Sequence, residues 1–476
     1  MKYDVVIIGS GLGGLICAKL LVDSGLTVIV LEQGRQAGGC LQSYRRNGVT
    51  FDTGLHYVGG LNEGHRLHSA FSRLGLMDLP WKRLDSEGFD RITIGSDTYP
   101  LAEGFDNFAE TLSKYFPNER EGLRQYVAML RHVDALPLAD PEVPQLMAIN
   151  AYDYLCSTLR DPILVNVVSG SATKLELNRE KLPLFTFAHV VSSYIQSSWR
   201  LCGGGGLIIE SLLRDIRKAG DEVVLGAEVG ELVEQNGCIT TARTTDGRTY
   251  EGNFFISDIH PDLTFRLVKE SSVLKKLFRK RIAMLENTMG TFTVSLVLKP
   301  NSLHYFNHNK YVYRQPNVWT FASETDGIGG VMVSCAIPTD GSNDARQIDL
   351  LTPMPYSTFS RWENTSVGRR MEEYKQLKEQ LADECVLLAE RVIPGLASMV
   401  SHRYISTPLT WHDYTLTPQG SAFGIRKDYR QPLLTMLSPR TPIPNLLLTG
   451  QSIHVHGLEG VTMTALQTTD IINKLK

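Results

Sequence analysis

Apolar runs and a helical pattern alternate regularly over the first part of the chain. A β-branched run covers residues 3–8 and stops at a glycine-rich turn, residues 9–14. The next segment has apolar residues on one side of a helix and ends at Ser24-Gly25, and a second apolar run follows over residues 26–31. A strand, a helix and a second strand in so short a space predict a βαβ unit with parallel strands.

The turn between the first strand and the helix carries a G-x-G-x-x-G spacing at Gly9, Gly11 and Gly14. Gly9 permits the turn, Gly11 lets the backbone approach a pyrophosphate, and Gly14 lets helix and strand pack closely. Glu32 closes the second run, where it is expected to accept hydrogen bonds from ribose hydroxyls and to disfavour a 2′-phosphate. This combination predicts a dinucleotide site in which the helix N-terminus faces the phosphates.

The residues after the second strand distinguish between dinucleotides. Arg35, Gly38 and Gly39 form an R-x-x-G-G sequence that resembles one large class of flavoproteins, which includes amine oxidases and carotenoid desaturases. In that class the arginine and both glycines lie along the flavin and its diphosphate. The resemblance implies FAD as the cofactor and an α/β fold with a glutathione-reductase-type, Rossmann-like FAD-binding lobe.

Two later segments are predicted to return to this lobe. The first has four glycines at 203–206, a helix over 207–219, and short strands at 222–225, 228–234, 239–245 and 254–257, with hairpin signals at 236–237 and 246–247. The resemblance implies that Val229 meets the adenine.

The second return is the C-terminal segment. A buried strand ends at Gly450-Gln451, and Gly460 lies in the opening of a final helix over 461–475. This helix N-terminus is expected near the flavin O2 and ribityl chain, where its dipole would stabilise an anionic reduced flavin.

The residues between the three segments assigned to the FAD-binding lobe carry no cofactor motif. We therefore expect an FAD-binding domain made of residues 1–65, 200–262 and 440–476, and a discontinuous mixed α+β substrate-binding domain made of 66–199 and 263–439. Within the latter, residues 371–392 form an amphipathic helical stripe expected to face the core. The apolar segment 182–201 either lines a lipophilic tunnel or fills a core, and the small-residue loop 417–424 is expected to approach the flavin.

Composition excludes several classes of protein. A net charge of −3 without a basic block argues against nucleic acid as a partner. No apolar run approaches the roughly 18 residues of a membrane-spanning helix, and the N-terminal apolar run is too short for a signal peptide. The seven cysteines include no Cys-x-x-Cys pair, so we expect free thiols and no metal site in a cytoplasmic protein.

One further segment makes the resemblance more specific. Residues 51–60, FDTGLHYVGG, resemble the F-D-x-G-x-H-Y-x-G element of retinol saturases and carotenoid isomerases, within the wider phytoene desaturase family. Residues 409–415, 417–422 and 449–451 strengthen the saturase-like branch. The resemblance covers most of the chain. It implies hydride transfer between FAD and a long conjugated polyene, with His56 and Tyr57 as candidate catalytic residues. Other candidate proton carriers are His412, His454 and His456.

The resemblance leaves several activities open. The chain is most like an all-trans-retinol 13,14-reductase, or saturase. The alternatives are a carotenoid desaturase or isomerase, an amine or porphyrinogen oxidase of the same flavoprotein class, and a non-enzymatic carrier of prenyl lipids. The expected partners are a lipophilic small-molecule substrate, NAD(P)H or another electron donor, and, through peripheral contact, a membrane surface.

Overall fold

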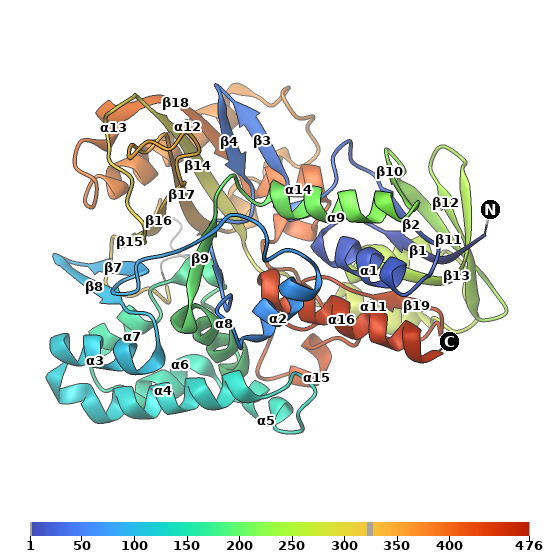
Figure 1. Ribbon diagram of the computed structural model, residues 1–476, viewed down its shortest axis with the longest axis horizontal. Coiled ribbons are helices and arrows are strands. Elements are labelled where there is room, and N and C mark those ends of the chain that lie inside the picture. The colour runs from blue at the N-terminus through green and yellow to red at the C-terminus, as the bar shows by residue number, and fades with distance from the viewer. Residues whose placement is uncertain (1, 321–326, 476) are drawn as a thin grey trace.

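The predicted βαβ unit forms the centre of one lobe, drawn on the right of Figure 1. In the computed structural model, which describes residues 2–320 and 327–475, it consists of β1 (Lys2–Ile8), α1 (Leu12–Asp23) and β2 (Val28–Glu32). β1 and β2 are parallel, with Val5 opposite Val28. Helix α1 is buried along most of its length, because other helices of the same lobe pack against it.

One seven-stranded sheet contains strands from all three segments of the chain that were predicted to form this lobe. Its order is β10-β2-β1-β13-β12-β11, and β19 pairs with the end of β13. Strands β10, β2, β1, β13 and β19 are parallel, whereas β11, β12 and β13 form an antiparallel meander. The later elements are α9 (Gly206–Lys218), β10 (Glu222–Leu225), β11 (Val229–Gln235), β12 (Cys238–Thr244), β13 (Thr249–Ser257), β19 (Leu446–Leu448) and α16 (Gly457–Leu475). The Rossmann-like α/β fold is thereby confirmed.

One strand of this sheet is longer than the sequence predicts. β13 begins at Thr249 and not at residue 254, because the turn at Asp246-Gly247 lets its first half pair with β12. Its second half lies between β1 and β19, so this strand connects the meander to the parallel part of the sheet.

A second, mainly antiparallel sheet forms the other lobe, with the order β18-β14-β17-β16-β15-β7-β8. Only the pair β15 and β7 is parallel among its described pairings. Its strands are β7 (Asp90–Ile94), β8 (Asp97–Leu101), β14 (Gly290–Leu298), β15 (Asn309–Tyr313), β16 (Gly330–Cys335), β17 (Gln347–Met354) and β18 (Val400–Ser406).

Helices cover this second lobe in two groups, which lie above and below in Figure 1. The lower group is α3 (Phe105–Tyr115), α4 (Arg120–Ala135), α5 (Val143–Met147), α6 (Ala151–Thr158), α7 (Pro162–Val168) and α8 (Leu184–Gln196). The upper group is α12 (Glu372–Ala389) and α13 (Leu396–Met399). The remaining helices are α2 (Arg66–Arg73), α10 (Pro261–Leu267), α11 (Lys276–Ala283), α14 (Pro408–Thr415) and α15 (Pro432–Thr435).

Two predictions about the core concern α12 and α8. The apolar stripe of α12 faces the core through Tyr374, Leu381, Cys385 and Leu388, although Met371, just before the helix, is 61% exposed. Helix α8 fills a core: Phe185 and Phe187 belong to a large buried cluster, as does Leu182 before the helix. Leu182 and Thr186 also line a small side cavity. Of the two interpretations of segment 182–201, core packing therefore accounts for most of its side chains.

Two small sheets lie between the lobes. Strands β3 (Ser43–Arg46) and β4 (Val49–Asp52) form a hairpin, and β5 (Val58–Gly59) and β6 (Trp81–Arg83) both pair with β9 (Ser198–Leu201). The segment 51–60 thus runs from the end of β4 to β5, along the boundary of the two lobes.

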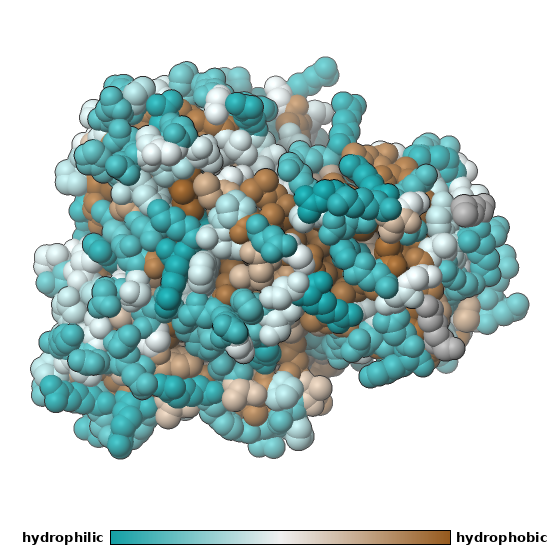
Figure 2. All heavy atoms as spheres, in the orientation of Figure 1, coloured by the Kyte–Doolittle hydropathy of each residue, from teal (hydrophilic) through white to brown (hydrophobic). Residues whose placement is uncertain are grey.

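Hydrophilic and hydrophobic residues are distributed unevenly over the surface (Figure 2). On the face shown in Figure 2, hydrophilic residues dominate the outer parts, and hydrophobic ones gather toward the middle, where the lobes meet. All seven cysteines are free. Within the described residues, no helix combines the length and apolar character needed to cross a membrane, and no group of side chains has a metal-binding arrangement.

Candidate functional site

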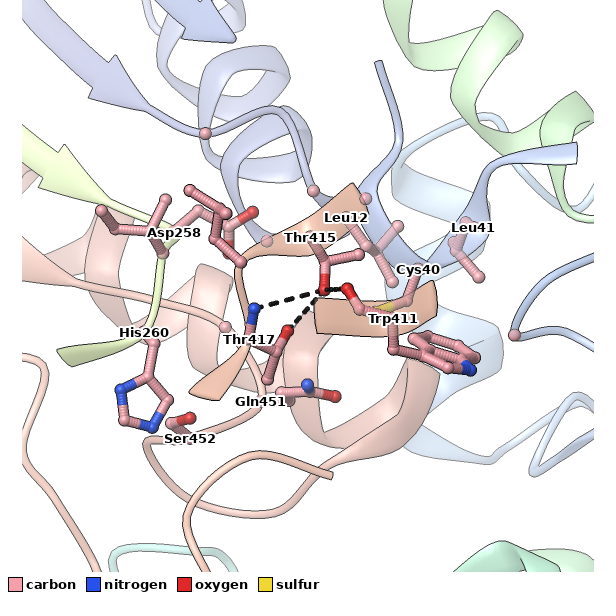
Figure 3. Close-up of a pocket in the computed structure, with 18 of the residues that line it drawn as sticks. Leu12, Cys40, Leu41, Asp258, His260, Trp411, Thr415, Thr417, Gln451 and Ser452 are labelled. Atoms are coloured by element: carbon pink, nitrogen blue, oxygen red, sulfur yellow. Dashed lines mark hydrogen bonds between the residues drawn. The ribbon is translucent and has the colours of Figure 1, made fainter. Parts of the chain in front are cut away.

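A cavity of about 450 Å³ lies between the two lobes. Its wall includes the glycine turn after β1, the ends of β13 and β19, the segment after β2, and parts of β14, β17 and α14 (Figure 3). Of the predicted site residues, nine line it: Gly9, Gly11, Glu32, Gly38, Gly39, His56, Val229, Gly450 and Gln451. The three segments of the chain that were predicted to bind the cofactor therefore meet at one cavity.

The glycine turn allows the backbone itself to form the cavity wall. Gly9 has φ +94°, a conformation that favours glycine. A Cβ on Gly11 would lie 2.5 Å from a carboxylate oxygen of Asp258. Gly14 lies outside the cavity wall, where a Cβ would lie 2.4 Å from the carbonyl oxygen of Gly9, so it allows α1 to pack against the end of β1.

Glu32 is held by the same turn. Its Oε2 accepts hydrogen bonds from the backbone N–H of Ser10 (3.0 Å) and from the Ser10 hydroxyl (2.6 Å). Its Oε1 accepts one from the backbone N–H of Gly34 (2.7 Å). These contacts fix the carboxylate at the cavity wall, at the carboxyl end of β2 where a ribose is expected.

Besides Gly14, two predicted cofactor residues lie away from the cavity wall. The side chain of Arg35 is exposed, and Gly460 packs closely against the backbone of Val455 within the start of α16. Gly460 therefore has a packing role in the structure, as Gly14 does. The role of Arg35 toward a cofactor stays a prediction.

Asp258 is a cavity residue that the motifs do not indicate. It follows β13 directly, and it lies against Gly11, Gly13 and Gly450 (Figure 3). Its pKa is raised to about 7, chiefly by burial and also by the charge of Glu32, while hydrogen bonds from the backbone N–H groups of Gly14 and Gly11 act in the opposite direction. Its position after a parallel strand is the signal from which it could be found, because ligands bind at the carboxyl ends of such strands.

His56 and Tyr57 lie in different surroundings. His56 lines the cavity, and its buried Nε2 has no hydrogen-bond partner among the described residues. Burial, together with the charge of Arg200, lowers the pKa of His56 to about 4, so its imidazole is neutral at pH 7. Tyr57 points into the second lobe, where its hydroxyl contacts Asp90 (2.9 Å) and Tyr311 (2.7 Å).

The other three candidate histidines do not reach this cavity. His454 contacts Gln467, and His456 contacts the backbone carbonyl of Lys174 at 2.8 Å. His412 lies 3.7 Å from Glu363. Of the five proposed proton carriers, His56 is therefore the one whose side chain borders the main cavity.

The second lobe closes the other side of the cavity. The predicted loop 417–424 contributes Thr417, Ala422 and Phe423, and α14 contributes Trp411, whose carbonyl accepts a hydrogen bond from Thr415 (2.7 Å, Figure 3). Further wall residues that the sequence analysis did not single out are Thr173, Glu176, His260, Met289 and Leu351.

Glu176 is held in place by an ion pair. Arg426 binds it through two N–H groups, at 2.6 and 2.8 Å, and the backbone N–H of Met289 donates to it at 2.9 Å. Since its oxygens are occupied, Glu176 is better suited to fixing the wall than to exchanging a proton.

Comparison with known proteins extends over the whole chain. Residues 7–74 match the family described as NAD(P)-binding Rossmann-like domain. The chain is 26% identical to all-trans-retinol 13,14-reductase of Rattus norvegicus, over 99% of this chain and 86% of that protein. It is 24% identical to the chloroplastic prolycopene isomerase of Daucus carota, over 95% of this chain and 76% of that protein.

Solved structures show the same fold at lower sequence identity. An oxidoreductase from Methanosarcina mazei matches with a TM-score of 0.68 and 16% identity, covering 99% of this chain and all of that one. Putrescine oxidase bound to putrescine matches with a TM-score of 0.67 and 15% identity, covering 100% of this chain and 99% of that one. The whole-chain similarity to the reductases and isomerases, together with the motifs that meet at the cavity, supports a relationship of this chain to the phytoene desaturase-like FAD-dependent oxidoreductases.

Proposed function

We propose that this protein binds FAD in the cavity between its lobes and reduces a double bond of a long conjugated polyene or isoprenoid, as an all-trans-retinol 13,14-reductase does. The observation that carries the proposal is the continuity of the cavity. It extends from the glycine turn and Glu32 to His56, and on to apolar side chains of the second lobe such as Leu351 and Phe423. A cofactor and an apolar substrate can therefore meet in one continuous cavity.

The wall fits the parts of FAD in order. The N-terminus of α1 directs backbone N–H groups and its positive dipole end toward the cavity, which suits a diphosphate, and the N–H groups of Gly11 and Gly14 also contact Asp258. Glu32 offers acceptors for ribose hydroxyls, and Val229, which the resemblance assigns to the adenine, lines the same cavity. Gly450, Gln451 and the start of α16 form the opposite end of the cavity, which suits the flavin.

When bound, FAD supplies hydride transfer at its N5 atom. The chain would then orient the polyene and exclude water, which is the chief requirement of such chemistry. Met289, Leu351 and Phe423 are suited to this, since they add apolar surface to the wall. His56 is a candidate for holding or moving a proton, because its neutral Nε2 can accept one.

Other activities remain as alternatives within the same class. A carotenoid desaturase would transfer hydride in the opposite direction, and an isomerase would show no net redox change. An amine or porphyrinogen oxidase is a third alternative, because this chain has the same fold as putrescine oxidase. Two further partners are proposed from the resemblance that suggests the polyene substrate. One is NAD(P)H or another electron donor, and the other is a membrane surface in peripheral contact with the protein.

A panel of substrates tests the proposal. The enzyme is reduced with dithionite without oxygen and incubated with retinoids and carotenoids, and the product spectra are recorded. A shortened chromophore indicates saturation, and an unchanged length with altered fine structure indicates isomerisation. Purified protein that is colourless and cannot be reconstituted with FAD would contradict the proposal at its first step.

The cofactor site has its own test. Glu32→Ala removes the ribose acceptors, each hydrogen bond to a charged group being worth about 1.5–3 kcal/mol. We expect a loss of FAD affinity of about tenfold or more with the fold intact, measured as flavin occupancy after gel filtration and by circular dichroism. Glu32→Gln, which keeps one acceptor, should lie between the variant and the native protein. Unchanged occupancy in Glu32→Ala would show that the ribose is elsewhere.

A further inference from the structure

Positive charge is concentrated in one short segment of the chain. Residues 263–285 contain seven basic residues and a single acid, Glu270, and five of the seven residues from 275 to 281 are Lys or Arg. This segment includes α11. The net charge of −3 for the whole chain conceals it. The chain therefore contains a local basic block that the sequence analysis did not identify.

The inner face of α11 is attached to the first lobe. Ile282 is buried, and the ring of Phe278 packs edge-on against Phe265 of α10, with the two centroids 5.1 Å apart. Arg279 donates hydrogen bonds to the backbone carbonyls of Phe265 and Val268. One of the basic residues thus anchors the helix, and these contacts fix which side of α11 faces outward.

The outer face of α11 combines apolar and basic side chains. Leu277, Lys280, Arg281 and Met284 follow one another at three- and four-residue steps, so they lie on one side of the helix. Leu277 is 79% exposed, and Met284, directly after the helix, is 71% exposed. Among the large hydrophobic side chains that the structure describes, only Leu433 is more exposed than these two.

The cations of this surface are free to meet a partner. The surface, which we call the α11 face, comprises Lys275, Lys276, Leu277, Lys280, Arg281 and Met284. None of its four basic residues forms an ion pair within the described part of the chain. Apart from Glu270, the acids nearest to them in sequence are engaged elsewhere: Asp262 pairs with Arg266, and Glu286 pairs with Lys181 and Arg426.

We propose that the α11 face docks this protein on a membrane surface that contains anionic lipids. Lys and Arg side chains are attracted to the headgroups of such lipids, and apolar side chains on the same helix face enter the boundary between headgroups and acyl chains. A nucleic acid would pair with the cations but leave Leu277 and Met284 against phosphate or water, so the composition of the face favours lipid. The inference deepens the proposed membrane contact by naming the surface and the charge of the lipid, and it does not depend on the polyene reaction.

Docking through the α11 face would place one side of the cavity near the lipid. Helix α10, which contacts α11, contributes Leu263, Arg266 and Leu267 to the cavity wall. After α11 the chain reaches the wall again at Met289, five residues beyond Met284. The α11 face is therefore joined to the cavity by short segments, and a docked protein would lie beside the phase in which a lipophilic substrate dissolves.

Sedimentation with vesicles tests the proposal on the flavin-loaded protein. The probes are vesicles of phosphatidylcholine alone and vesicles that also contain phosphatidylserine. The native protein should bind the anionic vesicles about tenfold or more tightly than the neutral ones, and this binding should weaken as the salt concentration is raised, because salt screens charge. Equal binding to both kinds of vesicle would overturn the proposal.

Two kinds of variant separate the effect of charge from that of the apolar side chains. Lys280→Glu combined with Arg281→Glu should lower the affinity for anionic vesicles about tenfold or more, whereas Lys280→Arg with Arg281→Lys should leave it within about twofold of the native value. Leu277→Ser should weaken binding about threefold or more, because it removes a side chain that enters the lipid, and should keep the dependence on salt.

Matched control variants lie on two other helices. Arg217→Glu with Lys218→Glu changes the net charge equally on α9, where both residues are exposed, and Leu387→Ser removes a 67% exposed leucine from α12. Both controls should bind anionic vesicles as the native protein does, and circular dichroism should show that every variant is folded. A control that loses binding as strongly as its counterpart on α11 would overturn the assignment to this face.

The outcomes distinguish this inference from the proposed function. A protein that reduces polyenes but binds no anionic vesicle would keep the proposed function and lose this inference. Retention on duplex RNA but on no vesicle would make the α11 face a nucleic-acid surface and overturn it as well. If the protein cannot be loaded with FAD, the proposed function fails, and the same vesicle measurements on the unloaded protein still decide the role of the α11 face.

Discussion

His56 and Tyr57 are adjacent in the sequence, yet only one of them faces the cavity. His56 lies in a bend of the chain, and Tyr57 directly precedes β5. His56 borders the cavity with a buried Nε2 that has no partner among the described residues, whereas the Tyr57 hydroxyl contacts Asp90 and Tyr311. The motif indicates both residues equally, and only the register of the backbone distinguishes them.

His56→Ala tests the residue that faces the cavity. Since His56 is expected to act on the substrate and not on the cofactor, the variant should slow flavin reoxidation by a polyene about tenfold or more, a typical contribution of a positioned proton carrier being larger still. Flavin occupancy should remain close to native. Stopped-flow absorbance measures the rate, and an equal loss of rate and occupancy would demote His56 to a structural role.

Asp258 predicts a pH dependence of cofactor binding. Its pKa of about 7 lies above the usual value for an aspartate because of burial, so it is mostly charged above pH 7 and mostly neutral below. A diphosphate beside it favours the neutral form. The dissociation constant for FAD should therefore fall as the pH is lowered from 8.5 to 6, by at most tenfold per unit, as titration calorimetry can measure.

Asp258→Asn is the control for that prediction. The amide keeps the shape of the side chain and cannot ionise, so FAD affinity should become nearly independent of pH over the same range. A native enzyme whose affinity does not change with pH would place the diphosphate away from Asp258.

At the scale of elements, the helices contribute to the molecule in two ways, through a buried apolar face or through an N-terminus at the cavity. The apolar stripe of α12 packs against the second sheet, as its periodicity predicts, and none of the described residues of α12 lines the cavity. The glycines that begin α1 form part of that wall, and Gly457 does so at the start of α16. A helix therefore affects function here through its N-terminus and stability through its buried face.

Two leucines on α12 separate these effects. Leu381 is 6% exposed and Leu387 is 67% exposed. Leu381→Ala should destabilise the protein by about 2–5 kcal/mol through lost burial and a cavity, whereas Leu387→Ala should change stability by less than about 0.5 kcal/mol. Thermal unfolding measures both, and flavin occupancy of the folded protein should be native in each. A large loss of stability in Leu387→Ala would contradict this prediction, because it would mean that the Leu387 side chain makes contacts that its exposure does not indicate.

At the scale of the molecule, the cavity belongs to neither lobe alone. Its wall combines a turn that follows β1 with segments more than 400 residues later, and it also includes strands of the second sheet. A ligand that contacts only the first lobe should therefore stabilise the protein less than one that spans the boundary.

FAD and ADP provide that comparison. FAD at 100 times its dissociation constant should add about 2.7 kcal/mol to the free energy of unfolding. ADP, which reaches only the glycine turn and Glu32, should bind more weakly and raise the melting temperature less at the same concentration. Calorimetry should show one shifted transition with FAD. Equal shifts with both ligands would mean that the flavin makes no contact with the second lobe.

Local pattern in the sequence was sufficient for the first lobe. The βαβ unit, the meander, and the C-terminal strand and helix are all present near their predicted bounds, because glycine turns and apolar periodicity act over a few residues. Gly9, Gly11, Glu32, Gly38, Gly39, Gly450 and Gln451 were found by the same local signals, and all of them line the cavity.

Tertiary structure alone decided the rest. It brings Asp258, Thr173 and Glu176 to the cavity, moves Arg35 and Tyr57 away from its wall, and joins Tyr57 to Asp90 through pairings between distant strands. The strand order of the second sheet leaves no mark on local sequence. It depends on which side chains meet across long separations in the chain, and it is this order that decides which residues border the cavity.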